Sequence, residues 1–90
     1  MAQNDLKKID LTTFFLSIAS TVYMRLGMLD NPHEASELDL DLARQSIDLL
    51  ELLQEKTQAN RTEEEDQLIQ QLLFETRMKF IEKEREIKSI

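Results

Sequence analysis

The stretch 42-LARQSIDLLELLQEKTQANRTEEEDQLIQQLLFETRMKF-80 contains two amphipathic helices and the turn between them. Apolar residues recur at intervals of three and four on both sides of residues 57–61, the spacing of one face of an α-helix. A connection this short makes two helices pack as an antiparallel hairpin. We therefore predict one helix over about residues 39–58 and a longer one that begins after Thr62.

The turn itself carries residues that end one helix and start the next. Thr62 followed by Glu65 is a capping-box pattern, in which each side chain accepts a hydrogen bond from the backbone N–H of the other residue. The acids around Glu65 add negative charge where the helix macrodipole favours it. Asn60 tolerates the left-handed conformation that ends many helices. We expect Asn60, Thr62 and Glu65 to form the hairpin corner.

A further helix is predicted over residues 11–26, where Gly27 can end it in a left-handed turn. The side of this helix away from its apolar stripe consists of Thr13, Ser17, Ser20, Thr21 and Met24. An exposed face in a chain that is 32% charged should carry Lys and Glu, so small uncharged residues favour close approach by another helix. We expect this side to be the contact face of a homo-oligomer, with a dimer favoured; a weakly polar exposed face is the alternative. The helix over residues 39–58 also has a second apolar face, formed by Leu42, Leu49 and Leu52.

Composition sets the fold class. Ninety residues make one small domain that buries only roughly 60–65% of its unfolded surface, so self-association would stabilise it. One Gly and one Pro leave few helix breakers. The prediction is an all-α, self-associating three-helix bundle, with an antiparallel hairpin of the second and third helices and a long C-terminal helix. Residues 10–88 form the domain, and residues 1–9 form a flexible arm.

Several function classes are disfavoured by the same composition. The chain has no cysteine, which excludes disulfides, thiol chemistry and Cys-based zinc sites. A net charge of −7 argues against binding to nucleic acid or to anionic membranes. The single histidine, His33, lies in a polar loop beside Asn31-Pro32 without another ligand at helical spacing, so we expect neither metal nor cofactor.

The N-terminal region has some features of a secretion signal. Lys7 and Lys8 precede the apolar run LTTFFLSIASTVY. However, Asp5 and Asp10 lie among them, and threonine and serine interrupt the run, which is also too short and polar to span a membrane. We predict a cytoplasmic protein.

Among the charged residues, Arg44 and Asp48 are the best candidates for a binding or catalytic site, because they are one helical turn apart. One interpretation is an anion-binding arginine oriented by a carboxylate, or an aspartate acting as general base. The other is an ion pair shared across the hairpin with Glu75 or Arg77. Arg before Asp is the less favourable order on one helix, so we favour the structural, cross-helix interpretation. With no nucleophile–base pair and no glycine-rich phosphate loop, the sequence predicts a protein that is not an enzyme.

The segments FFLSIASTVYMRLG and LARQSIDLLELLQEKTQANRTEEEDQLIQQLLFETRMKF together resemble the bacterial domain-of-unknown-function family 1844. The specific elements are Arg-x-x-Ile-Asp and Glu-Lys-Thr-x-x-Asn at the right separation. Ala59 stands where the family pattern has Gly, and Arg61 where it has Leu. The resemblance implies a small helical fold and a bacterial cytoplasmic setting, and it brings no established activity.

The preferred function is a helical protein-interaction module, an adaptor or regulatory subunit, that acts as a homo-oligomer. A bundle that binds a small anionic ligand through Arg44, Asp48 and Arg77 is the alternative. A third possibility, reversible membrane docking through Phe14 and Phe15, is disfavoured by the lack of Lys and Arg on the polar side of that helix.

Overall fold

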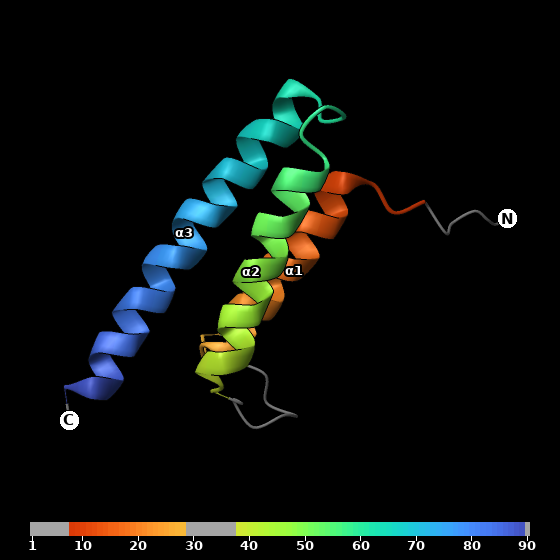
Figure 1. Cartoon of the computed structure of the whole chain (residues 1–90). Helices are drawn as coiled ribbons and strands as arrows, with labels where there is room; N and C mark the ends of the chain where they lie inside the picture. The colour runs from red at the N-terminus through yellow and green to blue at the C-terminus, as the bar shows by residue number, and fades with distance from the viewer. Residues whose placement is uncertain (1–7, 29–37, 90) are drawn as a thin grey trace, which may run out of the picture.

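Three helices make up the fold. The computed structural model describes residues 8–28 and 38–89, with α1 at Leu11–Arg25, α2 at Leu40–Lys56 and α3 at Glu63–Lys88. Each helix packs against the other two (Figure 1), which confirms the predicted all-α three-helix bundle. His33, the Asn31-Pro32 turn and most of the predicted N-terminal arm lie outside the described residues.

The ends of α1 and α2 follow the capping residues in the sequence. The Asp10 carboxylate accepts a hydrogen bond from the Thr13 N–H at 2.8 Å. That bond also lowers the pKa of the exposed Asp10 carboxyl. Asp39 caps α2 in the same way, at 3.1 Å from the Leu42 nitrogen. Gly27 has a φ of 72°, the left-handed conformation expected after α1.

The capping box at the start of α3 is formed as predicted. The Glu65 N–H donates to Thr62 Oγ1 at 3.1 Å, and the Thr62 N–H donates to Glu65 Oε1 at 2.8 Å. The end of α2 differs from the prediction, because the helix ends at Lys56, and Thr57 is its C-cap. Asn60 therefore does not cap α2; its N–H closes the following turn on the Thr57 carbonyl at 2.8 Å.

The core is formed by one face of each helix. Its fully buried large side chains include Phe15 and Leu26 from the α1 region, Leu50 from α2 and Ile69 from α3. The remaining buried hydrophobic residues of this cluster are Ile18, Ala19, Val22, Ala43, Ile47, Leu72 and Leu73. The buried Thr76 hydroxyl has a hydrogen-bond partner within the core, because it donates to the Leu72 carbonyl of its own helix at 2.7 Å.

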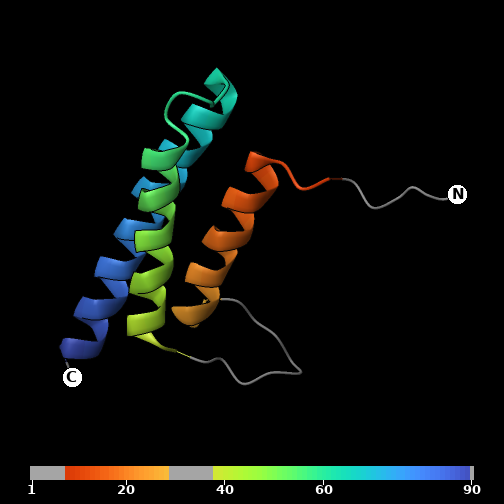
Figure 2. The ribbon, with the colours of Figure 1, turned by 45° about the vertical axis from the view of Figure 1, so that its right-hand side comes forward.

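The arrangement leaves three surfaces to consider. In Figure 1, α2 leads into the corner at the top and α3 returns along its side, while Figure 2 shows α1 on the other side of α2. The Asp39 N–H donates to the Arg25 carbonyl at 2.7 Å and so ties the start of α2 to the end of α1. The surfaces are the groove between α2 and α3, the groove between α1 and α2, and the outer side of α3.

Candidate functional site

The groove between α2 and α3 brings together three of the four charged residues singled out in the sequence: Arg44, Asp48 and Arg77. Glu51 and Glu84 also line it, above an apolar floor of Ile47, Phe80 and Ile81.

Two ion pairs lie in this groove. Arg44 Nε is 4.0 Å from Asp48 Oδ1, and both side chains are more than half exposed. Arg77 reaches across from α3 to Glu51 on α2, with Nη2 2.5 Å from Oε2. A cross-helix ion pair therefore exists, but it joins Arg77 to Glu51 and not to Asp48. Sequence reasoning missed Glu51, although its position one turn after Asp48 puts it on the same side of α2.

Glu75 lies apart from these three residues, which corrects the expectation that it would reach Arg44. Its carboxylate faces α1, where it accepts a hydrogen bond from the Tyr23 hydroxyl. Gln71 Nε2 also donates to Glu75 Oε2, at 3.1 Å. Burial raises the pKa of Tyr23, and the negative charge of Glu75 raises it further. Tyr23 and Glu75 thus form a polar link between α1 and α3 that the sequence alone did not suggest.

The charges of the α2–α3 groove suit anions poorly. Three carboxylates, on Asp48, Glu51 and Glu84, face two guanidinium groups, on Arg44 and Arg77. Glu51 already accepts two hydrogen bonds from Arg77, at 2.5 and 3.2 Å. An anion would have to displace this carboxylate and would still meet a net negative surface. The geometry supports the structural interpretation of Arg44, Asp48 and Arg77.

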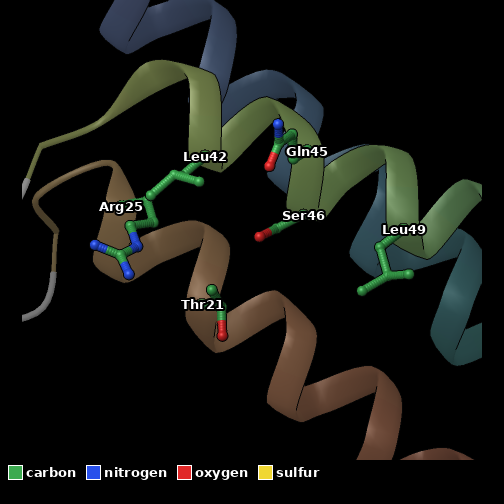
Figure 3. Close-up of a pocket in the computed structure, with 6 residues that line it drawn as sticks. All are labelled: Thr21, Arg25, Leu42, Gln45, Ser46 and Leu49. Carbon is green, nitrogen blue, oxygen red and sulfur yellow. The ribbon is translucent and has the colours of Figure 1, made fainter.

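The expected oligomer residues lie on the outer side of α1. Thr13, Ser17 and Ser20 are exposed, while Thr21 and Met24 are half-buried. Thr21 meets α2 at a shallow groove of about 320 Å³, whose other lining residues are Arg25, Leu42, Gln45, Ser46 and Leu49. Figure 3 shows Thr21 and Arg25 on α1, opposite Leu42, Gln45, Ser46 and Leu49 on α2, with α3 behind them.

Large apolar side chains surround this groove. Phe14 is 41% exposed, and Leu42, Leu49 and Leu52 of α2 are exposed to a similar extent. We refer to eight uncharged residues on this side of the two helices as the α1–α2 face: Phe14, Ser17, Thr21, Leu42, Gln45, Ser46, Leu49 and Leu52. Six of them are exposed, and Thr21 and Ser46 are half-buried. The charged Arg25 lines the same groove. The three leucines are the second apolar face of α2 identified in the sequence, and the structure places them beside the small residues of α1.

The structure bears on two of the disfavoured interpretations. Phe15 is fully buried in the core, so of the two phenylalanines considered for membrane docking only Phe14 is exposed. Within residues 8–28 and 38–89, no helix is long and apolar enough to cross a membrane. The same residues contain no group of three or more His, Cys, Asp or Glu side chains positioned to hold a metal ion.

Comparison with known proteins places the chain in a family. It matches no curated protein and no solved structure. The model of one protein family matches residues 8–82, which include all of α1 and α2 and most of α3. The resemblance inferred from the Arg-x-x-Ile-Asp and Glu-Lys-Thr-x-x-Asn elements is thereby confirmed. The chain belongs to the domain of unknown function family DUF1844.

Proposed function

We propose that this chain is a protein-interaction module of the bacterial cytoplasm, an adaptor or regulatory subunit without catalytic activity, which works as a homo-oligomer through its α1–α2 face. A dimer is the favoured state. The absence of cysteine from the sequence is in keeping with a reducing compartment.

The observation that carries the proposal is the uncharged character of the α1–α2 face. The chain is 32% charged, yet the eight positions of this face carry no ionisable side chain, and of the residues that line the groove between the two helices only Arg25 is charged. Four of the eight are large and apolar, with Phe14 and Leu49 each 41% exposed. Depletion of charge around exposed apolar side chains is the compositional mark of the centre of a protein interface.

A second copy is a suitable occupant for this face. In a two-fold dimer the face of one copy packs against the same face of the other, so an uncharged face can be buried without leaving a charge unpaired. The eight residues of the α1–α2 face avoid that cost. The small side chains of Ser17 and Thr21 let a partner helix approach closely, while the leucines of α2 supply the apolar area that is removed from water.

The proposal is tested by placing a charge in the face. Sedimentation velocity at micromolar concentrations should show that wild-type chain forms a dimer or larger species, and that Leu49→Glu weakens this self-association at least tenfold. Ser17→Lys should do the same from the α1 side. Gln58→Glu, which adds the same charge as Leu49→Glu at an exposed position of the corner, is the matched control and should leave the association unchanged.

Circular dichroism should show equal helicity in all four proteins. A wild-type chain that stays monomeric at these concentrations would contradict the proposal. The proposal would also be contradicted if a folded Leu49→Glu variant associated through the α1–α2 face as strongly as Gln58→Glu does.

A further inference from the structure

The outer side of α3 exposes a second group of apolar residues, separate from the α1–α2 face. Phe74 is 66% exposed, Met78 is 45% exposed and Ile81 is 43% exposed. They follow each other at spacings of four and three, so they line one side of the helix, and Ile81 also borders the α2–α3 groove. The buried residues Ile69 and Thr76 lie on the opposite side of α3.

The same spacing continues to both ends of α3. Steps of four and three lead from Phe74 back to Gln71, Gln67 and Glu64, and from Ile81 on to Arg85 and Lys88. We refer to these residues as the α3 stripe: Glu64, Gln67, Gln71, Phe74, Met78, Ile81, Arg85 and Lys88. Three of the eight, at the centre of the stripe, are apolar, and the spacing places all eight along one side of the helix where a single partner helix could contact them. Each of the eight is exposed.

Charge along the α3 stripe changes sign from one end to the other. Glu64 lies in the first turn of the helix, and Arg85 and Lys88 lie in its last turns. A parallel second copy of α3 would put Glu64 beside Glu64 and Lys88 beside Lys88, with repulsion at both ends. An antiparallel copy puts acid against base at both ends. The charges of the stripe therefore complement those of its own antiparallel copy.

In an antiparallel arrangement, several residues of the α3 stripe face residues of the partner's stripe with which they can interact. When two α3 helices are placed antiparallel with a two-fold axis level with Thr76, Phe74 faces the partner's Met78. This puts a phenyl ring against a thioether, a favourable contact. Glu64 then faces the partner's Lys88 at each end.

Of the positions between centre and ends, Gln67 supports this register. It faces the partner's Arg85, so an amide oxygen meets a guanidinium group. Gln71 faces the partner's Ile81, a pair without a polar interaction, and the Gln71 amide keeps its hydrogen bond to Glu75 on its own helix. Lys88 Nζ also lies 3.3 Å from Glu84 Oε2 on its own helix, but its side chain is 72% exposed, and so it can turn to a new carboxylate at little loss.

We propose that the α3 stripe is an interface between two copies of this chain, whose α3 helices run antiparallel about a two-fold axis level with Thr76. This goes beyond the proposed function, because it uses a different surface. The α1–α2 groove faces away from α3, as Figure 3 shows with α3 behind the groove. Contacts through both surfaces therefore join dimers to one another, and the mean mass should rise above that of a dimer as the concentration increases.

The test removes one surface at a time and measures mass by sedimentation equilibrium over a range of concentrations. Wild-type chain should exceed the dimer mass at high concentration. Leu49→Glu should retain only the α3 contact and level off at a dimer, as should Phe74→Lys, which retains only the α1–α2 contact. The double variant should be a monomer.

Charge exchange tests the antiparallel register. In the Leu49→Glu background, Glu64→Lys should weaken dimerisation about tenfold, because it brings the new lysine to the partner's Lys88. Lys88→Glu should weaken it similarly. The two changes together should restore dimerisation to within about threefold of the Leu49→Glu variant.

Several results would overturn the α3 contact. The first is a wild type that dimerises together with a folded Leu49→Glu variant that is monomeric at every concentration. That result contradicts the α3 contact and agrees with the α1–α2 proposal. Monomers from both single variants indicate that the α3 stripe of one copy packs into the α1–α2 groove of another. A failure of the charge exchange to restore dimerisation contradicts the antiparallel register. A monomeric wild type contradicts both proposals.

Discussion

Arg61 Nη2 lies 2.5 Å from Asp66 Oδ1, and only 8% of the Arg61 side chain is exposed. The same guanidinium group donates to the Gln54 carbonyl and, at 3.2 Å, to the Thr57 hydroxyl. Arg61 thereby joins the last turn of α2 to the first turn of α3. This chain closes its hairpin corner with an arginine whose side chain is 8% exposed.

Arg61→Ala should lower the free energy of unfolding by about 1–3 kcal/mol, because it leaves the Gln54 carbonyl and the Asp66 carboxylate without their partner. Arg61→Lys should recover only part of the loss, since one ammonium group cannot reproduce the planar fork that meets several acceptors. Urea unfolding followed by circular dichroism measures both changes.

Arg44→Ala is the control for this comparison. The Arg44 side chain is 67% exposed and lies 4.0 Å from Asp48, so its removal should change the unfolding free energy by less than about 0.5 kcal/mol. Equal losses for Arg44→Ala and Arg61→Ala would show that the corner contacts add nothing to stability.

Thr62→Ala should lower the free energy of unfolding by about 0.5–2 kcal/mol, because it removes the hydroxyl that accepts the Glu65 N–H at the start of α3. Thr62→Ser keeps an acceptor in this place and should retain most of the stability. Thermal unfolding of the two variants distinguishes the capping hydrogen bond from a general effect of changing the corner. A serine variant as unstable as the alanine variant would argue against the cap.

Phe15→Ala should lower the free energy of unfolding by about 3–5 kcal/mol, because Phe15 is fully buried and its removal leaves a cavity between the helices. That is a large part of the stability of a small domain, so much of the chain should be unfolded at physiological temperature. Circular dichroism at increasing temperature gives the measurement.

The neighbouring Phe14→Ala is the matched comparison. Phe14 is 41% exposed on the α1–α2 face, so its removal should change stability far less than that of Phe15 and should instead weaken self-association. Similar unfolding curves for the two variants would contradict the assignment of Phe15 to the core and Phe14 to the surface.

Tyr23 should titrate above its ordinary pKa of 10.0, because burial and the charge of Glu75 both disfavour the tyrosinate. The folded state holds the proton more tightly than the unfolded chain does. The stability linked to this shift is therefore present below pH 10 and is lost as the pH rises from there through the folded-state pKa. Tyr23 is the single tyrosine of the chain, so the ultraviolet absorbance of tyrosinate reports on it alone.

Glu75→Gln removes the carboxylate and should move the Tyr23 pKa down toward its ordinary value, though not all the way, since burial is the larger cause. Glu82→Gln, on the same helix, is the control and should leave the titration unchanged. A Tyr23 that titrates identically in wild type and Glu75→Gln would contradict the α1–α3 link.

Local patterns predicted most of the secondary structure. The Thr62–Glu65 pair before α3 acts on backbone groups within one turn of itself, so its role could be predicted from the sequence. The end of α2 was predicted less well. Asn60 was the residue most tolerant of a left-handed conformation, but the chain leaves the helix at Thr57, where Arg61 binds the Gln54 carbonyl and the Thr57 hydroxyl.

By itself, the sequence determined three amphipathic helices, their capping and a bundle, because hydrophobic spacing and capping depend on residues a few positions apart. Only the tertiary structure decided the pairing of charges and the extent of the surfaces. Arg77 meets Glu51 and not Asp48, and Glu75 meets Tyr23 and not Arg44, because the rotation of each helix about its axis decides which neighbour a side chain faces. That rotation is set by the packing of the whole core, in which residues from all three helices take part together.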